Sequence, residues 1–222
     1  MSEPEPLRPL STSQRGALEE ATSTYQAAVT PQAARYLLNR GIDRQAADTF
    51  RLGVVADPMP GHERFRGFLS IPYLDRNRRP LTMRFRCIEA HEHRELGHGK
   101  YMSITGEPAR VYNITAIHHA ADDIHVCEGE FDAQVLTVVG LPAVAIPGAS
   151  GWRNHHRRML AGFSRVWVWG DPDDAGAEFT TKVTRSLRTA KGVRLRTGDV
   201  TDTYLTGGAD ALHALIGKEA RT

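Results

Sequence analysis

The chain has 222 residues, 41% of them hydrophobic, and a formal net charge of +2, so it can bury the core of one large domain or two small ones. No apolar run approaches the roughly 20 residues of a membrane span, and the N-terminus lacks the apolar stretch of a signal peptide. We therefore expect a cytoplasmic protein with no membrane partner. The two cysteines, Cys87 and Cys127, form no CxxC pair, so no zinc is expected in this chain.

The first part of the chain is predicted to be helical. The residue patterns favour helices over 12–29, 31–40 and 44–50. Thr30 and Asp43 are suited to cap the second and third helices, and Gly41 is suited to end the second. Residues 1–11 are expected to be a flexible N-terminus.

The middle of the chain is basic and predicted to contain strands. Residues 31–110 carry 14 basic and 9 acidic side chains, a local net charge of +5, and the basic residues are nearly all arginine. Arginine suits phosphate because its planar fork donates two parallel hydrogen bonds, although a solvated basic face explains the same charge. Residues 68–71 and 81–86 favour two strands joined by a turn over 75–80. Alternation in the second strand places Arg84 and Arg86 on one face.

A polar loop over 91–100 follows these strands. Its three histidines, His91, His93 and His98, allow two interpretations: a transition-metal site, or an exposed hairpin loop without a ligand. The exposed hairpin loop is the favoured interpretation.

From about residue 121 the pattern alternates between short strands and helices. Strands are predicted over 124–127, 143–146, 165–169 and 193–196, and helices over 131–139, 153–161, 175–190 and 208–218. Such alternation with short connections indicates a parallel sheet covered by helices. The predicted fold class is α/β, with a basic α+β subdomain over 12–118 and a parallel-sheet domain over 119–222.

Acidic residues follow three of these strands. Glu128 comes after the first, Asp171 and Asp173 after the third, and Asp199 after the fourth. If the strands are neighbours, the acids converge at the carboxyl edge of the sheet, where open parallel sheets place their working sites. Two carboxylates 5 Å apart repel by about 3 kcal/mol at an effective dielectric of 20, so the group needs a compensating cation. Oxygen ligands favour Mg²⁺ or Mn²⁺, which predicts metal-assisted phosphoryl chemistry.

Other interpretations of these acids are weaker. A calcium loop beginning at Asp171 would need a glutamate at its twelfth position, which is Lys182 here. A phosphatase-type Asp-x-Asp nucleophile would leave Glu128 without a role. Helix capping needs no ligand, and Asp174 and Asp202 are the residues expected to cap helices in this region.

The ordered acidic motifs resemble those of the Toprim domain, a Rossmann-like parallel sheet flanked by helices. The motifs are Glu128-Gly129 with Asp132, then Asp171-Pro172-Asp173, then Asp199-Val200-Thr201-Asp202-Thr203-Tyr204-Leu205. Toprim domains serve primases, nucleases, topoisomerases and recombination mediators, so this resemblance alone does not fix the function.

The upstream segment resembles the catalytic core of phage or bacterial DnaG-type primases, which is their RNA polymerase domain. The resemblance covers roughly residues 20–217 and is carried by 34–42, 50–53, 64–66, 71–72, 84–86, 100–103 and 111–114. It implies DNA-directed RNA polymerase activity in DNA replication, making short RNA primers on a single-stranded DNA template from ribonucleoside triphosphates. It also implies that template and nucleotide phosphates are held by Arg66, Arg84, Arg86 and Lys100.

The same resemblance implies roles for the acids. Glu128, Asp171 and Asp173 would be catalytic and, with Asp199 and Asp132, would hold two or more Mg²⁺ or Mn²⁺ ions; Glu128 would be a ligand or a general base. The family's zinc-binding and helicase-binding domains have no counterpart here, so a separate zinc-binding module and a replicative helicase are expected partners. A Toprim-type nuclease and a non-catalytic recombination mediator remain the alternatives.

Overall fold

The computed structural model describes residues 9–147, 151–196 and 198–217. The chain forms two compact units: the first takes in the chain up to Ala33 together with 48–109, and the second takes in 34–47 together with 110–222. The expected division after residue 118 differs from this partition, because 34–47 group with the C-terminal part of the chain. Among the described helices, none combines the length and apolar character that crossing a bilayer requires.

The N-terminal helices begin where polar side chains accept hydrogen bonds from their first turns. They are α1 (Thr12–Ala27), α2 (Pro31–Leu38) and α3 (Arg44–Thr49). The Thr30 hydroxyl accepts from the Ala33 amide at 3.2 Å, and Asp43 Oδ1 accepts from the Ala46 amide at 2.7 Å. The two predicted caps are therefore confirmed.

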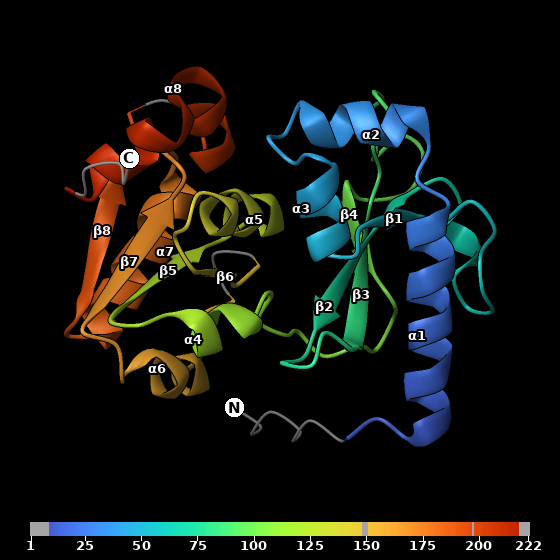
Figure 1. The fold of residues 1–222 in the computed structure, drawn as a ribbon, viewed down its shortest axis with the longest axis horizontal. Helices are drawn as coiled ribbons and strands as arrows, with labels where there is room; N and C mark the ends of the chain where they lie inside the picture. The colour runs from blue at the N-terminus through green and yellow to red at the C-terminus, as the bar shows by residue number, and fades with distance from the viewer. Residues whose placement is uncertain (1–8, 148–150, 197, 218–222) are drawn as a thin grey trace. The chain divides into compact units, whose positions relative to one another are not determined.

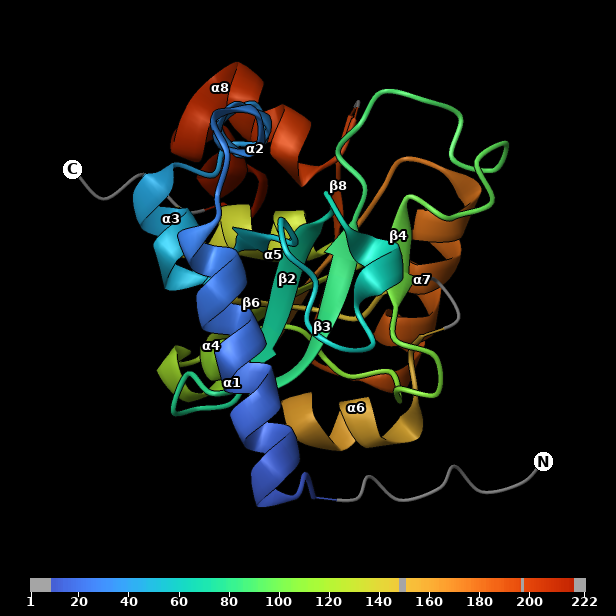
Figure 2. The same ribbon diagram turned by 90° about the vertical axis from the view of Figure 1, so that its right-hand side faces the viewer.

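The first unit contains an antiparallel sheet with α1 running beside it (Figures 1 and 2). The strands, in spatial order, are β1 (Gly53–Val54), β2 (Leu69–Leu74), β3 (Pro80–Arg86) and β4 (Tyr101–Ser103), and a 3₁₀ turn, η1 (Glu63–Phe65), precedes β2. The apolar core between helix and sheet is made of Ala21, Tyr25, Val55, Phe65, Phe68, Met83, Phe85 and Cys87. The two predicted strands are confirmed, and β4 is an additional strand that follows the polar loop.

The second unit contains a four-stranded parallel sheet in the order β6-β5-β7-β8. The strands are β5 (Asp123–Cys127), β6 (Ala143–Ala145), β7 (Arg165–Gly170) and β8 (Ala190–Arg194), and the helices are α4 (Thr115–His119), α5 (Glu130–Val138), α6 (Asn154–Leu160), α7 (Asp174–Ser186) and α8 (Val200–Leu215). One face of the sheet packs against α4, α6 and α7, and α5 lies on the opposite face (Figure 1). This is the arrangement that right-handed crossovers require, and the predicted α/β class is confirmed.

The predicted end of α7 and the predicted starts of β8 and α8 were wrong. Helix α7 ends at Ser186 and β8 begins at Ala190, because Leu187 turns to an extended conformation and buries its side chain in the core. Helix α8 begins at Val200 instead of residue 208, because Asp199 caps it, and Gly208 with φ +67° forms a kink inside it. The predicted end at Lys218 lies outside the described residues.

Two glycines of the first unit should respond to substitution in opposite directions. A Cβ at Gly53 would run into the backbone of Tyr25, whereas a Cβ at Gly16 in α1 meets nothing within 4 Å. We expect Gly53→Ala to lower the free energy of unfolding by about 1–3 kcal/mol through overpacking. We expect Gly16→Ala to raise it by up to about 1 kcal/mol, because alanine favours helix. Chemical denaturation measures both, and equal effects would contradict the packing of α1 on β1.

Candidate active site

The carboxyl ends of β5 and β7 bring Glu128 and Asp171 to the same edge of the parallel sheet. The two strands are neighbours, and their register pairs Cys127 with Trp169. Glu128 follows β5 directly, Asp171 follows β7 directly, and both side chains are half-buried. Because paired strands lie about 4.8 Å apart, two carboxylates from distant parts of the sequence share one edge of the sheet.

The turn from β7 into α7 fixes Asp171 and Asp173 together. Asp173 is the N-cap of α7, and its Oδ1 accepts a hydrogen bond from the Gly176 amide at 2.7 Å. A Cβ at Gly176 would collide with the backbone nitrogen and oxygen of Asp171, so this turn closes tightly only around glycine. The expectation that Asp174 is the cap was wrong, since Asp174 is the first residue of the helix itself.

Asp199 is held at the start of α8 by reciprocal hydrogen bonds. Its Oδ1 accepts from the Asp202 amide at 2.8 Å, and Asp202 Oδ2 accepts from the Asp199 amide at 3.3 Å. Arg40 Nη1 lies 3.8 Å from Asp199 Oδ2. Asp202 was expected to be the helix cap, but Asp199 takes that position. Sequence reasoning also missed Arg40, because nothing near it in the sequence marks a partner so far along the chain.

Asp132 connects α5 to α8. Its Oδ1 accepts hydrogen bonds from the backbone amide of Thr201 at 3.3 Å and from the Thr201 hydroxyl at 3.1 Å. A Cβ at Gly129 would lie only 2.6 Å from Asp132 Oδ2, which gives a steric reason for the glycine after Glu128. Burial, together with the smaller effects of the Asp199 and Asp171 charges, raises the pKa of Asp132 to about 8.

The acids of this edge lie within one another's electric fields. Burial first, and then the charges of Asp171 and Asp173, raise the pKa of Glu128 to about 7. The pKa of Asp171 is also raised, first by burial and then by Asp199, Asp173 and Asp202. The structure thus brings together the five acids that the sequence predicts, namely Glu128, Asp132, Asp171, Asp173 and Asp199.

This edge suits a hard divalent cation. Within the described part of the chain, Arg40 is the one basic side chain within ion-pair distance of these five acids. Their potential ligand atoms are all oxygens, which favours Mg²⁺ or Mn²⁺. Among the described residues, no three of these carboxylates bring their oxygens within 4.8 Å of one another. That spacing suits Mg²⁺ bound by one or two carboxylates plus substrate phosphates, and does not suit a cage made by the protein alone.

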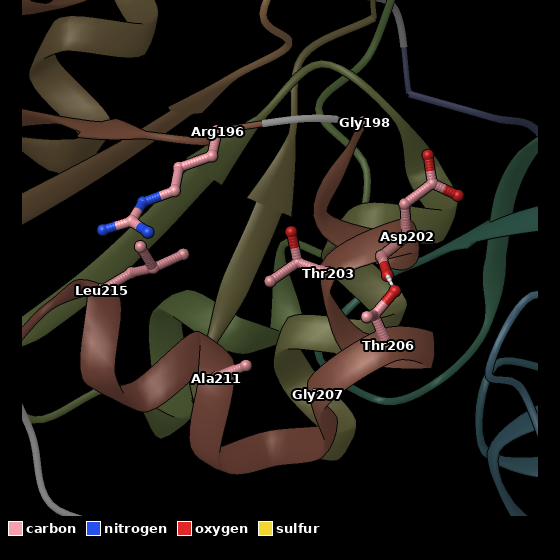
Figure 3. A pocket seen from close by; sticks show the side chains of 8 residues that line it. All are labelled: Arg196, Gly198, Asp202, Thr203, Thr206, Gly207, Ala211 and Leu215. Carbon is pink, nitrogen blue, oxygen red and sulfur yellow. Dashed lines mark hydrogen bonds between the residues drawn. The ribbon is translucent and has the colours of Figure 1, made fainter.

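A hollow of about 420 Å³ lies beside the kink of α8, separate from this group of acids (Figure 3). It is lined by Arg196, Gly198, Asp202, Thr203, Thr206, Gly207, Ala211 and Leu215. The carboxyl group of Asp202 turns away from the hollow, and the Thr206 hydroxyl donates to the Asp202 carbonyl at 2.9 Å. Since none of the five acids lines it, the hollow is not the site predicted from the sequence.

The predicted phosphate-binding residues belong to the first unit. The guanidinium groups of Arg84 and Arg86 lie 4.9 and 4.5 Å from the centre of the Tyr101 ring, so the prediction that both occupy one face of β3 is confirmed. Lys100 directly precedes β4, next to Tyr101. Arg66 lies elsewhere, at the end of η1, where its Nη1 donates to the Ala56 carbonyl at 2.8 Å.

Comparison with known proteins identifies a relative from a phage. No family model matches the chain. The Gene 57 protein of Mycobacterium phage D29 is 33% identical over 153 residues, which is 67% of this chain and 97% of that protein. The chain belongs to the family of the phage D29 Gene 57 protein.

Solved structures of DnaG primases share the fold of the chain. The Aquifex aeolicus primase, with its zinc-binding and RNA polymerase domains, matches with a TM-score of 0.75 and 20% identity over 93% of this chain and 61% of that one. The RNA polymerase domain of Mycobacterium tuberculosis DnaG, in complex with a double-stranded DNA oligomer with a 6-nucleotide overhang, matches with a TM-score of 0.74 and 19% identity over 91% of this chain and 78% of that one. The chain therefore has the fold of the DnaG catalytic core and spans about three fifths of the Aquifex chain.

Asp132→Asn should stabilise the metal-free protein in a pH-dependent way. The pKa of Asp132 rises from near 4 to about 8 on folding, so the wild type loses stability as pH rises through that range. Asparagine carries no charge to bury. We expect the variant to gain up to a few kcal/mol over the wild type at pH 8 and almost nothing at pH 4. Urea unfolding in the presence of a chelator measures this, and a gain independent of pH would contradict the buried charge.

Proposed function

We propose that the chain is a primase-type nucleotidyltransferase that uses Mg²⁺ or Mn²⁺ to make short RNA primers on single-stranded DNA. The observation that carries this proposal is the convergence of Glu128, Asp171, Asp173 and Asp199 at one edge of a sheet in the fold of the DnaG catalytic core. The DNA complex of the M. tuberculosis domain supports DNA as the partner. We also propose that the reaction takes place in the replication of a phage or bacterial genome.

Asp171, Asp173 and Asp199 would hold the divalent ions, and Asp132 supports them. The hydrogen bonds from Thr201 tie Asp132 to the first turn of α8, and Asp199 caps that same turn. Asp132 is thus positioned to fix the orientation of α8 or to serve as an additional ligand. When bound, the ions neutralise charge on the nucleoside triphosphate and polarise its α-phosphorus.

Glu128 has two roles open to it at this edge. As a ligand it adds a carboxylate oxygen for a divalent ion, and as a base it accepts the proton of the attacking ribose 3′-hydroxyl. Its half-buried position beside Asp171 and Asp173 supports either role. In both cases its carboxylate acts directly in phosphoryl transfer.

The arginines of β3 would bind phosphate groups of the template or the incoming nucleotide. Arg84 and Arg86 both lie on the ring of Tyr101, which restricts the rotamers of two long side chains before any ligand arrives. Lys100 and Arg66 are the further basic residues in this proposal. A separate zinc-binding module and a replicative helicase are proposed as partners in initiation.

Primer synthesis by variants of the acids tests the proposal. The assay combines the chain with Mn²⁺, labelled ribonucleotides and a mixed set of single-stranded templates. Glu128→Gln and Asp171→Asn should each lower synthesis by about 10²–10⁴-fold while the fold stays intact, because each removes a charge used in phosphoryl transfer. Asp174→Asn is the matched control, because Asp174 is exposed on the first turn of α7, and it should retain synthesis.

Two outcomes would contradict this assignment. Undiminished synthesis by Glu128→Gln would remove Glu128 from the reaction. Shortening of a labelled DNA strand, without any RNA product from the wild type, would favour the nuclease alternative.

A further inference from the structure

A second group of potential metal ligands lies in the first unit, in the loop between β3 and β4. The two strands are antiparallel neighbours, and the Cys87 amide extends their ladder by donating to the Lys100 carbonyl at 3.0 Å. The intervening loop therefore starts and ends at one place. It places His91, His93 and His98 next to Cys87. One potential ligand atom from each of these four residues lies within 4.8 Å of the others.

Two of the distances inside this group match the ligand–ligand distances of a tetrahedral zinc site. Cys87 Sγ lies 3.5 Å from His91 Nε2, and His91 Nε2 lies 3.2 Å from His98 Nε2. Zinc binds sulfur at about 2.3 Å and imidazole nitrogen at about 2.0–2.1 Å, which in a tetrahedron separates neighbouring ligands by about 3.6 Å for S–N and about 3.3 Å for N–N. Both distances in the structure lie within about 0.1 Å of these values.

The orientation of the rings also favours a metal. His98 Nδ1 lies 3.1 Å from the Gly99 carbonyl, which can only accept, so the proton is on Nδ1 and the lone pair of Nε2 faces the group. Metal-binding histidines commonly donate their other ring nitrogen to a carbonyl in this way. Nδ1 of His93 is enclosed and has no hydrogen-bond partner among the described residues. The three rings are packed with centroids 4.7–5.3 Å apart.

We propose that Cys87, His91, His93 and His98 bind one Zn²⁺ ion in a closed, four-coordinate structural site. One thiolate with three imidazoles is a donor set that suits zinc and differs from the oxygen ligands of the parallel-sheet edge. The proposal revises the expectation that this chain binds no zinc. That expectation rested on the absence of a CxxC pair and did not combine Cys87 with the histidines of the loop.

The bound zinc would attach the loop to the core of the first unit. Cys87 belongs to that core, and the ring of His98 packs edge-on against Phe68 at 5.2 Å. Four protein ligands leave no open position, so the ion would have a structural role. The strands that flank the loop carry Arg84 and Tyr101. Bound zinc would therefore also restrict the motion of the proposed phosphate-binding face of β3. Only this last consequence rests on the proposed function.

Metal analysis of the whole chain tests the site. Zinc content is measured by mass spectrometry after purification in zinc-containing buffer and desalting, and the chelator-treated protein is titrated with Co²⁺. We expect about one zinc per chain, and a cobalt spectrum with tetrahedral d–d bands and a thiolate charge-transfer band. His91→Ala should weaken zinc affinity by at least about 100-fold. His118→Ala changes an exposed histidine outside the group and should leave zinc binding unchanged.

The outcomes separate this proposal from the proposed function. Because Cys87 is buried, Cys87→Ser can unfold the first unit, so His91→Ala, His93→Ala and His98→Ala serve as the main variants. A wild type without zinc and without a tetrahedral cobalt spectrum would overturn the site, as would full zinc binding by all three histidine variants. Asp171→Asn should lose primer synthesis and keep its zinc, so each proposal can fail alone.

Discussion

The second unit depends on one constraint: several carboxyl groups are buried close to one another at the edge of its parallel sheet. Burial and mutual repulsion raise the pKa values of Glu128, Asp132 and Asp171, so the metal-free fold holds these groups at a cost in stability. Hydrogen bonds nonetheless fix three of the five acids: Asp173 and Asp199 cap helices, and Thr201 donates to Asp132. The acids thus destabilise the metal-free protein, yet several secondary-structure elements hold them in place. This combination is typical of a cation-binding site.

How far the sequence predicts this site depends on how local each interaction is. Strand–helix alternation predicted the parallel sheet, and its geometry then predicted that Glu128 and Asp171 share an edge. The starts of β8 and α8 were misplaced, because Leu187 and Asp199 take their roles from core packing and from a reciprocal cap. Arg40 could not be paired with Asp199 from the sequence, because their proximity exists only in the folded unit.

The β3–β4 loop shows a different limit of prediction from sequence. From the sequence, an exposed hairpin loop is favoured over a metal site for its histidines, because composition does not show which residues the folded loop brings together. Antiparallel pairing of Arg86 with Tyr101 brings the end of the loop back to Cys87, and the fourth potential ligand then becomes apparent. The two units thus offer different donor sets, oxygen in the second and nitrogen with sulfur in the first. Because these donor sets favour different metals, the two proposed sites would bind different ions.

A crystal of the chain grown with Mn²⁺ and a non-hydrolysable nucleoside triphosphate, recorded at the manganese absorption edge, tests the central claim most directly. We predict anomalous density for manganese at the carboxyl edge of the parallel sheet, contacting Asp171 or Asp173 and the triphosphate, with the carboxyl group of Glu128 facing the ion. A map without manganese at this edge, with Glu128 turned away from Asp171 and Asp173, would contradict the account.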